Sequence, residues 1–377
     1  MRSRVRARVV SGLALVLASS AGACASTSPE PAFRDVADVV QQRSGHRPTW
    51  DRDNEATRQT DAAIDRLLAS ELQVDGAVQV ALLASPHLRA TFEELAIGQA
   101  DLVQAGLLKN PVLGVGMTAY ESEHIDPNVF VSIEQDFLQL LTVPMKKRVA
   151  ETELEATKLR VADEVLRVSA EVRTAFYSAQ AAEQVVLVRR LVRDASEASA
   201  ELARRQHDAG NLSDLALANE LGMASQVRLD LRKSEGEAAI ARERLTRLMG
   251  MWGARTAWKL APRLPELPPV EVPLERLESL AITNRLDIGA ARREVQAIDS
   301  MLSLTSAARW TGFINVEVEA ARLRGSKRIA FGPRASIELP LFDQRHAAVA
   351  RLESLKRSSV DRLQGMSIDV RSEVRST

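Results

Sequence analysis

The stretch Phe313-Ile314-Asn315-Val316-Glu317-Val318-Glu319-Ala320-Ala321 alternates apolar and polar side chains with a period of two. Because successive side chains of an extended strand point to opposite faces, one face would be apolar and the other would carry Asn315, Glu317 and Glu319. A tilted strand of about nine to eleven residues crosses the hydrocarbon of a bilayer. The stretch therefore predicts a membrane-crossing strand with an apolar face and an acidic face.

Three further stretches alternate in the same way, which gives two predicted strand pairs. These pairs are 112–120 with 129–137, and 313–321 with 329–341. The first pair carries Leu113, Val115 and Met117 on one side and Val129, Val131 and Ile133 on another. The turns at 126–128 and 325–327 fit hairpin tips at an aqueous surface.

Four strands cannot close a barrel by themselves. Unpaired backbone groups in lipid are costly, so other copies of the chain must complete the sheet, and a homo-oligomer is expected. The polar face would then line a pore and favour cations. The predicted pore-facing residues are Asn315, Glu317, Glu319, Arg334 and Glu338. The alternative is the edge of a water-soluble sandwich, with these side chains in ordinary solvent.

A long helical hairpin is predicted at 145–249. No proline or glycine occurs between 145 and 207, and small apolar residues follow steps of four and three. These residues are Val161, Val165, Val168, Val172, Ala175, Ala179, Ala182 and Val186. About sixty residues at about 1.5 Å each make a rod of roughly 90 Å, which must pack along other helices. Gly210 would end this helix, and Ser213 would cap the returning one.

The two halves of the chain resemble each other. Ser132-Ile133-Glu134 recurs as Ser336-Ile337-Glu338, and three further matches keep an offset close to two hundred residues, which predicts an internal duplication. Each half would open with helix, at 75–104 with Asp75 as N-cap and at about 274–308. The repeats would span 51–261 and 274–377. The proline-rich segment 262–273 would connect them.

The N-terminus is typical of an exported protein. Residues 1–23 combine a basic start, a short apolar run and small residues, as a signal peptide does. Cys24, the only cysteine, follows Ala21-Gly22-Ala23, which resembles a bacterial lipobox and implies acylation and an outer-membrane anchor. The alternative is a plain signal peptide with a chance cysteine. Residues 24–50 would be a lipidated tether.

The composition shows no sign of catalysis or of nucleic-acid binding. Charged residues make up 27% with zero formal net charge, and aromatics only 4%, so a basic or stacking surface for nucleic acid is not expected. The five histidines lie far apart, at His46, His87, His124, His207 and His346. We expect no enzyme, no cofactor and no metal site.

Several motifs resemble the TolC-like outer-membrane factors of tripartite efflux pumps. They are the strand-to-helix junction 332–344 with Leu339-Pro340-Leu341-Phe342-Asp343, the opening helices at 81–90, and Asn284-Arg285-Leu286-Asp287-Ile288. The resemblance implies a mainly α fold with membrane β structure. In a homotrimer, antiparallel coiled-coil helices would form an α-barrel tunnel, and four strands per subunit would build one twelve-stranded β-barrel.

The resemblance also implies partners and a place in the cell. Such a subunit is a passive export duct that sits in the outer membrane, extends into the periplasm and receives substrate from an inner-membrane pump through a periplasmic adaptor. The hairpin tip is the end of the rod that can meet another protein. The expected adaptor-contact residues are Arg205, Gly210, Leu212, Ser213 and Leu215, whose alternative role is only to turn the chain. Lys146-Lys147-Arg148 could lie near anionic headgroups or simply be solvated.

In the repeat alignment, the second hairpin tip falls about thirty residues beyond Thr377, so a truncated second repeat is expected. This leaves two further hypotheses. The chain could be a non-conducting or degenerate copy of such a channel, or, less readily, a periplasmic coiled-coil adaptor. The exported substrate, whether metal ion, drug or solvent, is not indicated by any residue pattern.

Overall fold

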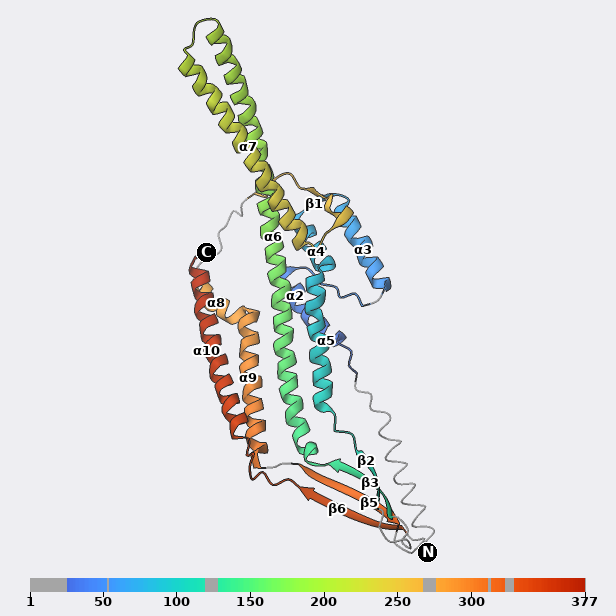
Figure 1. Cartoon of the computed structure of the whole chain (residues 1–377). Coiled ribbons are helices and arrows are strands. Elements are labelled where there is room, and N and C mark those ends of the chain that lie inside the picture. Colours follow the sequence, from blue (N-terminus) through green and yellow to red (C-terminus); the bar gives the residue numbers. More distant parts are fainter. Residues whose placement is uncertain are drawn as a thin grey trace. The chain divides into compact units, whose positions relative to one another are not determined.

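The structure, a computed structural model, describes residues 26–52, 54–118, 128–266, 276–310, 313–322 and 329–376 (Figure 1). The chain divides into two compact units. The first, called here the sheet unit, comprises Met1–Ala32, Leu95–Thr157 and Ile288–Thr377. The second, called here the rod unit, comprises Phe33–Glu94 and Lys158–Asp287. The predicted signal peptide, Cys24 and His124 lie outside the described residues.

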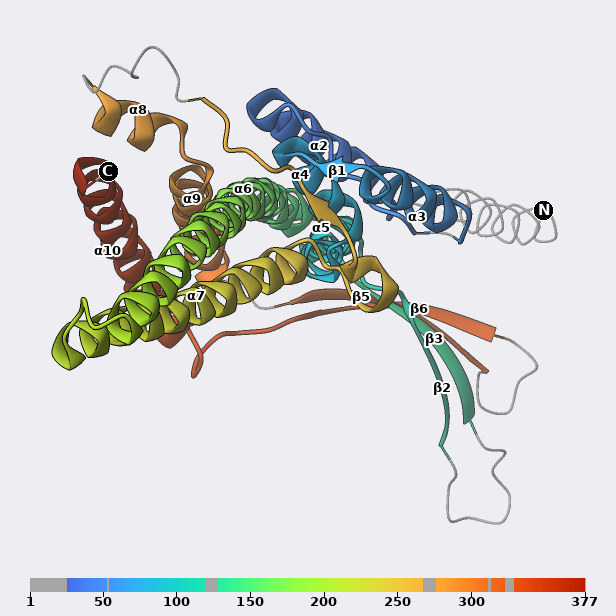
Figure 2. The ribbon, with the colours of Figure 1, turned by 90° about the horizontal axis from the view of Figure 1, so that it is seen from above.

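Four antiparallel strands form the sheet of the sheet unit, in the order β2-β3-β5-β6 (Figure 2). Their bounds are β2 Val112–Thr118, β3 Asn128–Asp136, β5 Ile314–Arg322 and β6 Ile329–Ile337. The four predicted strands are therefore confirmed. β6 ends four residues before the predicted end at 341, at Ile337, whose partner Ile314 is the first residue of β5.

The pairing register gives the sheet one apolar face. Leu113 pairs with Ile133, and Val115 with Val131, so the two apolar sets that were assigned to different sides lie on one face. The whole apolar set on this face is Leu113, Val115, Met117, Val129, Val131, Ile133, Ile314, Val316, Val318, Ala320, Ile329, Phe331, Pro333, Ala335 and Ile337. Gln135 and Arg322 share this face towards the two ends of the strands.

Two long antiparallel helices make the hairpin, α6 (Leu138–Asp208) and α7 (Asp214–Leu248). The predicted seam is buried along α6 from Val161 to Ala179, and Ala182 is half-buried. α6 begins seven residues before the predicted start at 145. The Leu138 N–H donates to Asp136 Oδ1 at 3.1 Å, so the last residue of β3 caps the helix, a local device that the heptad pattern does not reveal.

The opening helices of the two repeats are broken at equivalent positions. α4 (Val74–Ala84) and α5 (Pro86–Gly106) meet at Ser85, while α8 (Leu277–Asn284) and α9 (Leu286–Ala307) meet at Arg285. Both junction residues are extended, and each donates its N–H to the carbonyl four residues before, on Ala81 and Ala281. Pro86 enforces the first break. The second persists without a proline, which supports the internal duplication.

The N-cap of α4 is Gln73 and not Asp75, which was the predicted cap. Asp75 lies in the first turn, where its Oδ1 is 2.9 Å from Arg173 Nη2 and 3.3 Å from His46 Nε2. The carboxylate therefore tethers α4 to α6 instead of satisfying the backbone of its own helix.

The tether predicted at 24–50 is wrong over most of its length, because Glu30–Ser44 form helix α2. Val36, Ala37 and Val40 are buried on one side of it, at helical spacing. The Lys158 ammonium bonds Asp35 at 2.8 Å, and Phe33 packs edge-on against Phe92. The proline and hydroxyl content of the segment suggested a linker, whereas its apolar spacing specifies a docked helix.

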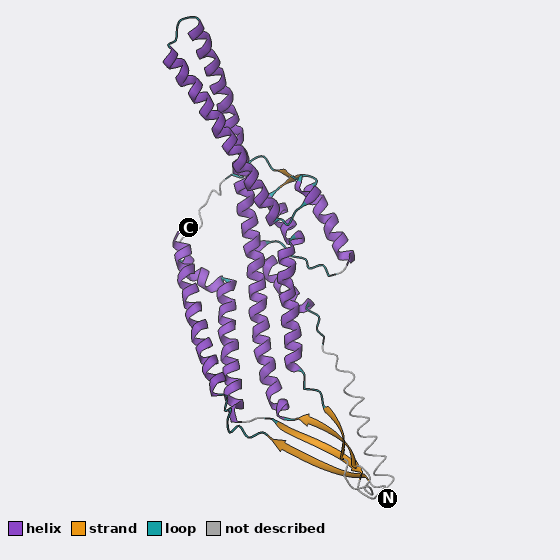
Figure 3. Cartoon of the chain, viewed as in Figure 1, coloured by secondary structure: helices purple, strands orange, loops and turns teal. Residues whose placement is uncertain are grey.

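The remaining elements are short or follow β6. They are α3 (Asn54–Leu68), the parallel ladder of β1 (Glu71–Leu72) with β4 (Lys259–Leu260), the 3₁₀ turns η1 (Gly253–Thr256) and η2 (Ala308–Trp310), and α10 (His346–Ser376) (Figure 3). The described part of the connector, 262–266, is neither helix nor strand. Gln180 Nε2 donates to the carbonyls of Ala261 and Arg263 at 2.7 and 2.6 Å, which pins this connector to α6.

Within the described ranges, no helix is both long enough and apolar enough to cross a membrane.

The buried valine seam predicts where the rod unit is vulnerable. Val172→Ala removes two methyl groups from a fully buried site, so we expect a loss of about 2 kcal/mol of stability. The control is Thr174→Ala, because Thr174 is a polar residue that is exposed on the same helix. The thermal midpoint of helical circular dichroism in detergent should fall clearly only for Val172→Ala. Equal falls for the two variants would contradict this packing.

Candidate functional site: a two-faced sheet and a hairpin tip

The polar face of the sheet brings the predicted pore-facing residues together. Arg334 pairs with Glu317 across the ladder, and its guanidinium lies 3.3 Å from the Glu317 carboxylate and 3.4 Å from that of Glu319. The Asn315 amide donates to Glu134 on β3. Glu338 follows β6 and donates its N–H to the Phe313 carbonyl at 3.1 Å, which continues the ladder by one residue.

The sequence prediction missed the acidic residues of β3 on this face. Register places Glu134 opposite Glu317, and Asp136 opposite Asn315. The signal was available, because Glu134 occupies the place in the first repeat that Glu338 occupies in the second. With these residues the polar face carries Glu134, Asp136, Glu317, Glu319 and Glu338 against Arg334.

Small residues near the hairpin ends of this face accommodate an aromatic ring. A Cβ built on Gly116 would lie 2.2 Å from Phe130 Cζ, so only glycine leaves room for the ring that covers it. Phe130 thus packs over its cross-strand neighbour on a face that is otherwise charged and small.

No described part of the chain covers the opposite face, although this face is apolar. Val115 on β2 is 70% exposed and Phe331 on β6 is 72% exposed. Both strands also lie at the ends of the sheet order, so each has one edge of N–H and C=O groups without a strand partner in the described chain. An exposed apolar face bounded by two open edges is unstable in water and requires both a covering medium and further strands.

At the base of the sheet, polar side chains fix where strand becomes helix. The Lys109 N–H donates to Gln139 Oε1 at 2.9 Å, and Gln135 Nε2 donates to the Lys109 carbonyl at 3.1 Å. Lys146, Lys147 and Arg148 lie further along α6 and are exposed, with the Lys147 ammonium 3.7 Å from Glu151. The basic triplet is thus a solvent-accessible cationic site in the third turn of the helix.

The hairpin tip is formed as the sequence predicts. Gly210 adopts φ of +81°, which favours glycine, and Ser213 Oγ accepts from the Ala216 N–H at 3.3 Å as the N-cap of α7. Arg205 and Leu215 are exposed, whereas Leu212 is half-buried. The Arg205 Nε donates to Glu201 at 3.1 Å, so this side chain is held along its own helix.

His207 is a tip residue that the sequence prediction did not single out. Its Nε2 lies 2.7 Å from Asp214 Oδ1, across the turn, and its Nδ1 lies 3.7 Å from Asp208. The hydrogen bond with Asp214 raises the pKa of His207. The imidazole and the carboxylate therefore clasp the two ends of the turn most strongly when the imidazole is protonated.

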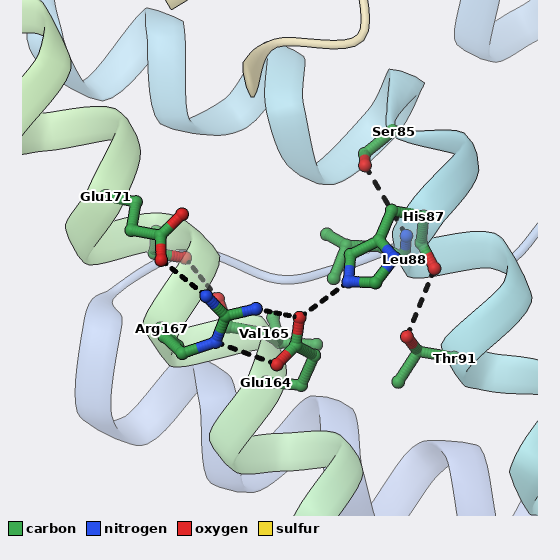
Figure 4. A network of polar contacts seen from close by, with 9 residues as sticks. Ser85, His87, Leu88, Thr91, Glu164, Val165, Arg167 and Glu171 are labelled. Atoms are coloured by element: carbon green, nitrogen blue, oxygen red, sulfur yellow. Dashed lines mark hydrogen bonds and ion pairs between the residues drawn. The ribbon is translucent and has the colours of Figure 1, made fainter. Parts of the chain in front are cut away.

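Further along α6, a network of charged groups joins the rod to the opening helices (Figure 4). Glu164 Oε1 lies 2.7 Å from His87 Nε2, and Arg167 bonds both Glu164 and Glu171. The hydrogen bond from Arg167 lowers the pKa of Glu164. Next to it, burial raises the pKa of Asp163, and the nearby Asp287 carboxylate adds to this effect.

The described histidines lie in four separate contacts, as the sequence suggested, with Asp75, Glu164, Asp214 and Arg309. Across the described residues, no group of three or more His, Cys, Asp or Glu side chains could hold a metal ion. The candidate functional site therefore consists of the two faces and two open edges of the sheet, and of the hairpin tip.

Solved structures resemble the chain over most of its length. A membrane protein from Pseudomonas aeruginosa aligns with a TM-score of 0.66 at 20% identity, covering 82% of this chain and 74% of that one. The outer-membrane channel OprN gives 0.66 at 17%, covering 86% and 76%. The outer membrane protein VceC from Vibrio cholerae gives 0.61 at 18%, covering 79% and 76%. The chain therefore has the fold of these solved outer-membrane proteins, a mainly helical fold with long helices and a small antiparallel sheet, which agrees with the fold that the sequence resemblance implied.

No protein-family model and no curated protein matches the chain.

The histidine clasp predicts a pH-dependent turn. A pKa raised in the folded chain above its ordinary value of 6.5 means that the stabilisation is complete below pH 6.5 and is lost as the pH rises through the folded pKa. Asp214→Asn should return the His207 pKa towards 6.5. Histidine NMR of the chain in detergent would measure it, with His207→Gln assigning the signal. An unchanged pKa in Asp214→Asn would refute the clasp.

Proposed function

We propose that the chain is a subunit of an outer-membrane efflux duct, a passive channel that carries small molecules or ions out of the periplasm. The observation that carries this proposal is the sheet, which has an exposed apolar face, a charged face and two open edges. A lipid bilayer is the medium that suits the first face, and an aqueous lumen suits the second. The resemblance of the fold to solved outer-membrane channels supports the same assignment.

The open edges support assembly from identical copies. β6 of one copy and β2 of the next would pair antiparallel, since strand direction alternates across the sheet order. Three copies of four strands would make a twelve-stranded closed barrel, an even number as outer-membrane barrels usually have. The hairpins of the three copies would pack around one tunnel through their exposed apolar residues, which include Leu191 and Ile240.

The charged face would give the lumen a preference for cations. Five carboxylates face one guanidinium on each copy, which leaves an excess of four negative charges per chain on this face. Lys109 approaches only Asp136, at 3.9 Å, and so offsets one of them. In a narrow lumen with low-dielectric walls, such an excess attracts cations and repels anions.

The hairpin tip would meet a periplasmic adaptor that connects the duct to an inner-membrane pump. Arg205, Leu212 and Leu215 present a guanidinium and two leucines around the turn set by Gly210 and Ser213. An acylated Cys24 would anchor the chain to the outer membrane. The described side chains offer no catalytic arrangement, so the pump would supply the energy.

Two measurements test the duct. The detergent-solubilised chain should have the mass of a trimer by light scattering, and it should conduct ions in a planar bilayer. A monomer that remains soluble without detergent, or a trimer that never conducts, would contradict the proposal.

The charged face also predicts how ion selectivity responds to mutation. Glu317→Gln with Glu319→Gln should move the reversal potential in a KCl gradient towards zero, because the cation preference falls. Arg334→Gln should move it the opposite way, because it frees both carboxylates. Glu55→Gln on α3 is the control, since this carboxylate is exposed outside the sheet unit. Identical reversal potentials in all variants would show that this face does not line the conducting path.

A further inference from the structure

Where α9 leads into β5, two cationic residues and exposed aromatics gather. Trp310 is 62% exposed, and the Arg309 guanidinium lies 4.9 Å above its ring. The strand next to β5 is β6, and the segment after it carries Leu339, Leu341 and Phe342. The Phe342 side chain is fully exposed. The apolar face of the sheet therefore ends in a collar of large side chains beside a guanidinium.

Arg309 lacks a carboxylate partner among the contacts of the described residues. Its Nη2 lies 2.8 Å from both ring nitrogens of His346, the first residue of α10. Its Nε is buried and donates to no acceptor in the described chain. A buried N–H without an acceptor is costly, so this donor points to an oxygen ligand that the described residues do not supply.

The loop before α10 adds a second guanidinium. Arg345 holds φ of +57°, in the left-handed region that a non-glycine residue rarely adopts. Its N–H donates to Asp343 Oδ1 at 2.8 Å, and Gln344 Oε1 lies 3.1 Å from His346 Nε2. These contacts fix the loop at Arg345, which directly precedes α10 and its first residue His346, the residue that contacts Arg309.

We infer that this interfacial cluster, formed by Arg309, Trp310, Phe342, Arg345 and His346, binds the headgroup of an anionic phospholipid. Guanidinium groups donate paired hydrogen bonds that match the oxygens of a phosphodiester. Trp310 lies at the level that aromatic residues occupy between hydrocarbon and water. Phe342 and the two leucines give the acyl chains an apolar surface continuous with the sheet.

The inference rests on the proposed function, because it assumes that the apolar face is immersed in lipid. Charge favours lipid over a protein partner at this place. The carboxylate nearest in the sequence, Asp343, accepts a hydrogen bond from the Arg345 backbone N–H, and no ion pair joins it to Arg309 or Arg345 among the described residues. A phospholipid supplies both parts of what the cluster lacks, a phosphate and hydrocarbon, in one molecule.

The test uses the full chain in a neutral detergent. The chain is equilibrated with equal amounts of phosphatidylglycerol and phosphatidylcholine of identical acyl chains and then repurified, and the retained lipids are quantified by mass spectrometry. The unmodified chain should enrich phosphatidylglycerol. Arg309→Gln with Arg345→Gln should reduce the enrichment about fivefold for each guanidinium removed. Arg371→Gln, far along α10, is the matched control and should change nothing.

Further arms separate the alternatives. If glycerol 1-phosphate displaces the lipid at equal concentration, the cluster binds a small anion and the lipid assignment is wrong. If the double variant keeps its enrichment while circular dichroism shows it folded, the inference is overturned. Trimer mass and conductance are measured on the same preparations. A chain that enriches phosphatidylglycerol without conducting would disprove the duct and leave the lipid site standing.

Discussion

The structure depends on one constraint: a four-stranded sheet that is apolar on one face and open at both edges cannot persist alone in water. Val115 and Phe331 expose most of their surface on that face, on the two edge strands. The unpaired N–H and C=O groups of an edge strand would also be costly in a bilayer, because lipid supplies no hydrogen-bond partners. In the proposed duct, a membrane around the sheet and further copies of the same strands beside it would satisfy both.

Short polar contacts fix the junctions between the strands and the helices. The buried valine and alanine seam of α6 takes no part in these junctions. Asp136 ends β3, and its carboxylate accepts the N–H of Leu138, the first residue of α6, so only Phe137 separates strand from helix. Gln135 and Gln139 tie the segment before β2 to the same place through Lys109. The second repeat uses other means, a loop with a left-handed Arg345 before α10. The duplication therefore preserves the topology while the local devices that secure each junction differ.

The elements with a clear repeating pattern or a clear turn signal could be predicted from the sequence. Four strands follow from a period of two, the rod follows from a seam of valine and alanine, and the tip follows from Gly210 and Ser213. The sequence did not predict helix α2, because composition suggested a linker where apolar spacing specified a docked helix. The exact register did not follow from periodicity. The repeat of Ser132-Ile133-Glu134 at 336–338 indicated that Glu134 shares a face with Glu338, and the pairing of Glu134 with Glu317 shows that both repeats contribute acids to that face.

The central claim is that the two edge strands of neighbouring copies pair with each other. Disulfide trapping tests it most directly, in a Cys24→Ser background that leaves no other cysteine. Each variant carries one cysteine in place of Val115 on β2 and a second in place of Phe331, Pro333 or Ala335 on β6. Membranes that contain the variant are then oxidised. The account predicts that at least one pair yields a covalently closed trimer, while each single cysteine yields at most a dimer. If every cysteine pair yielded only monomer after oxidation, the claim that the edge strands pair would be contradicted.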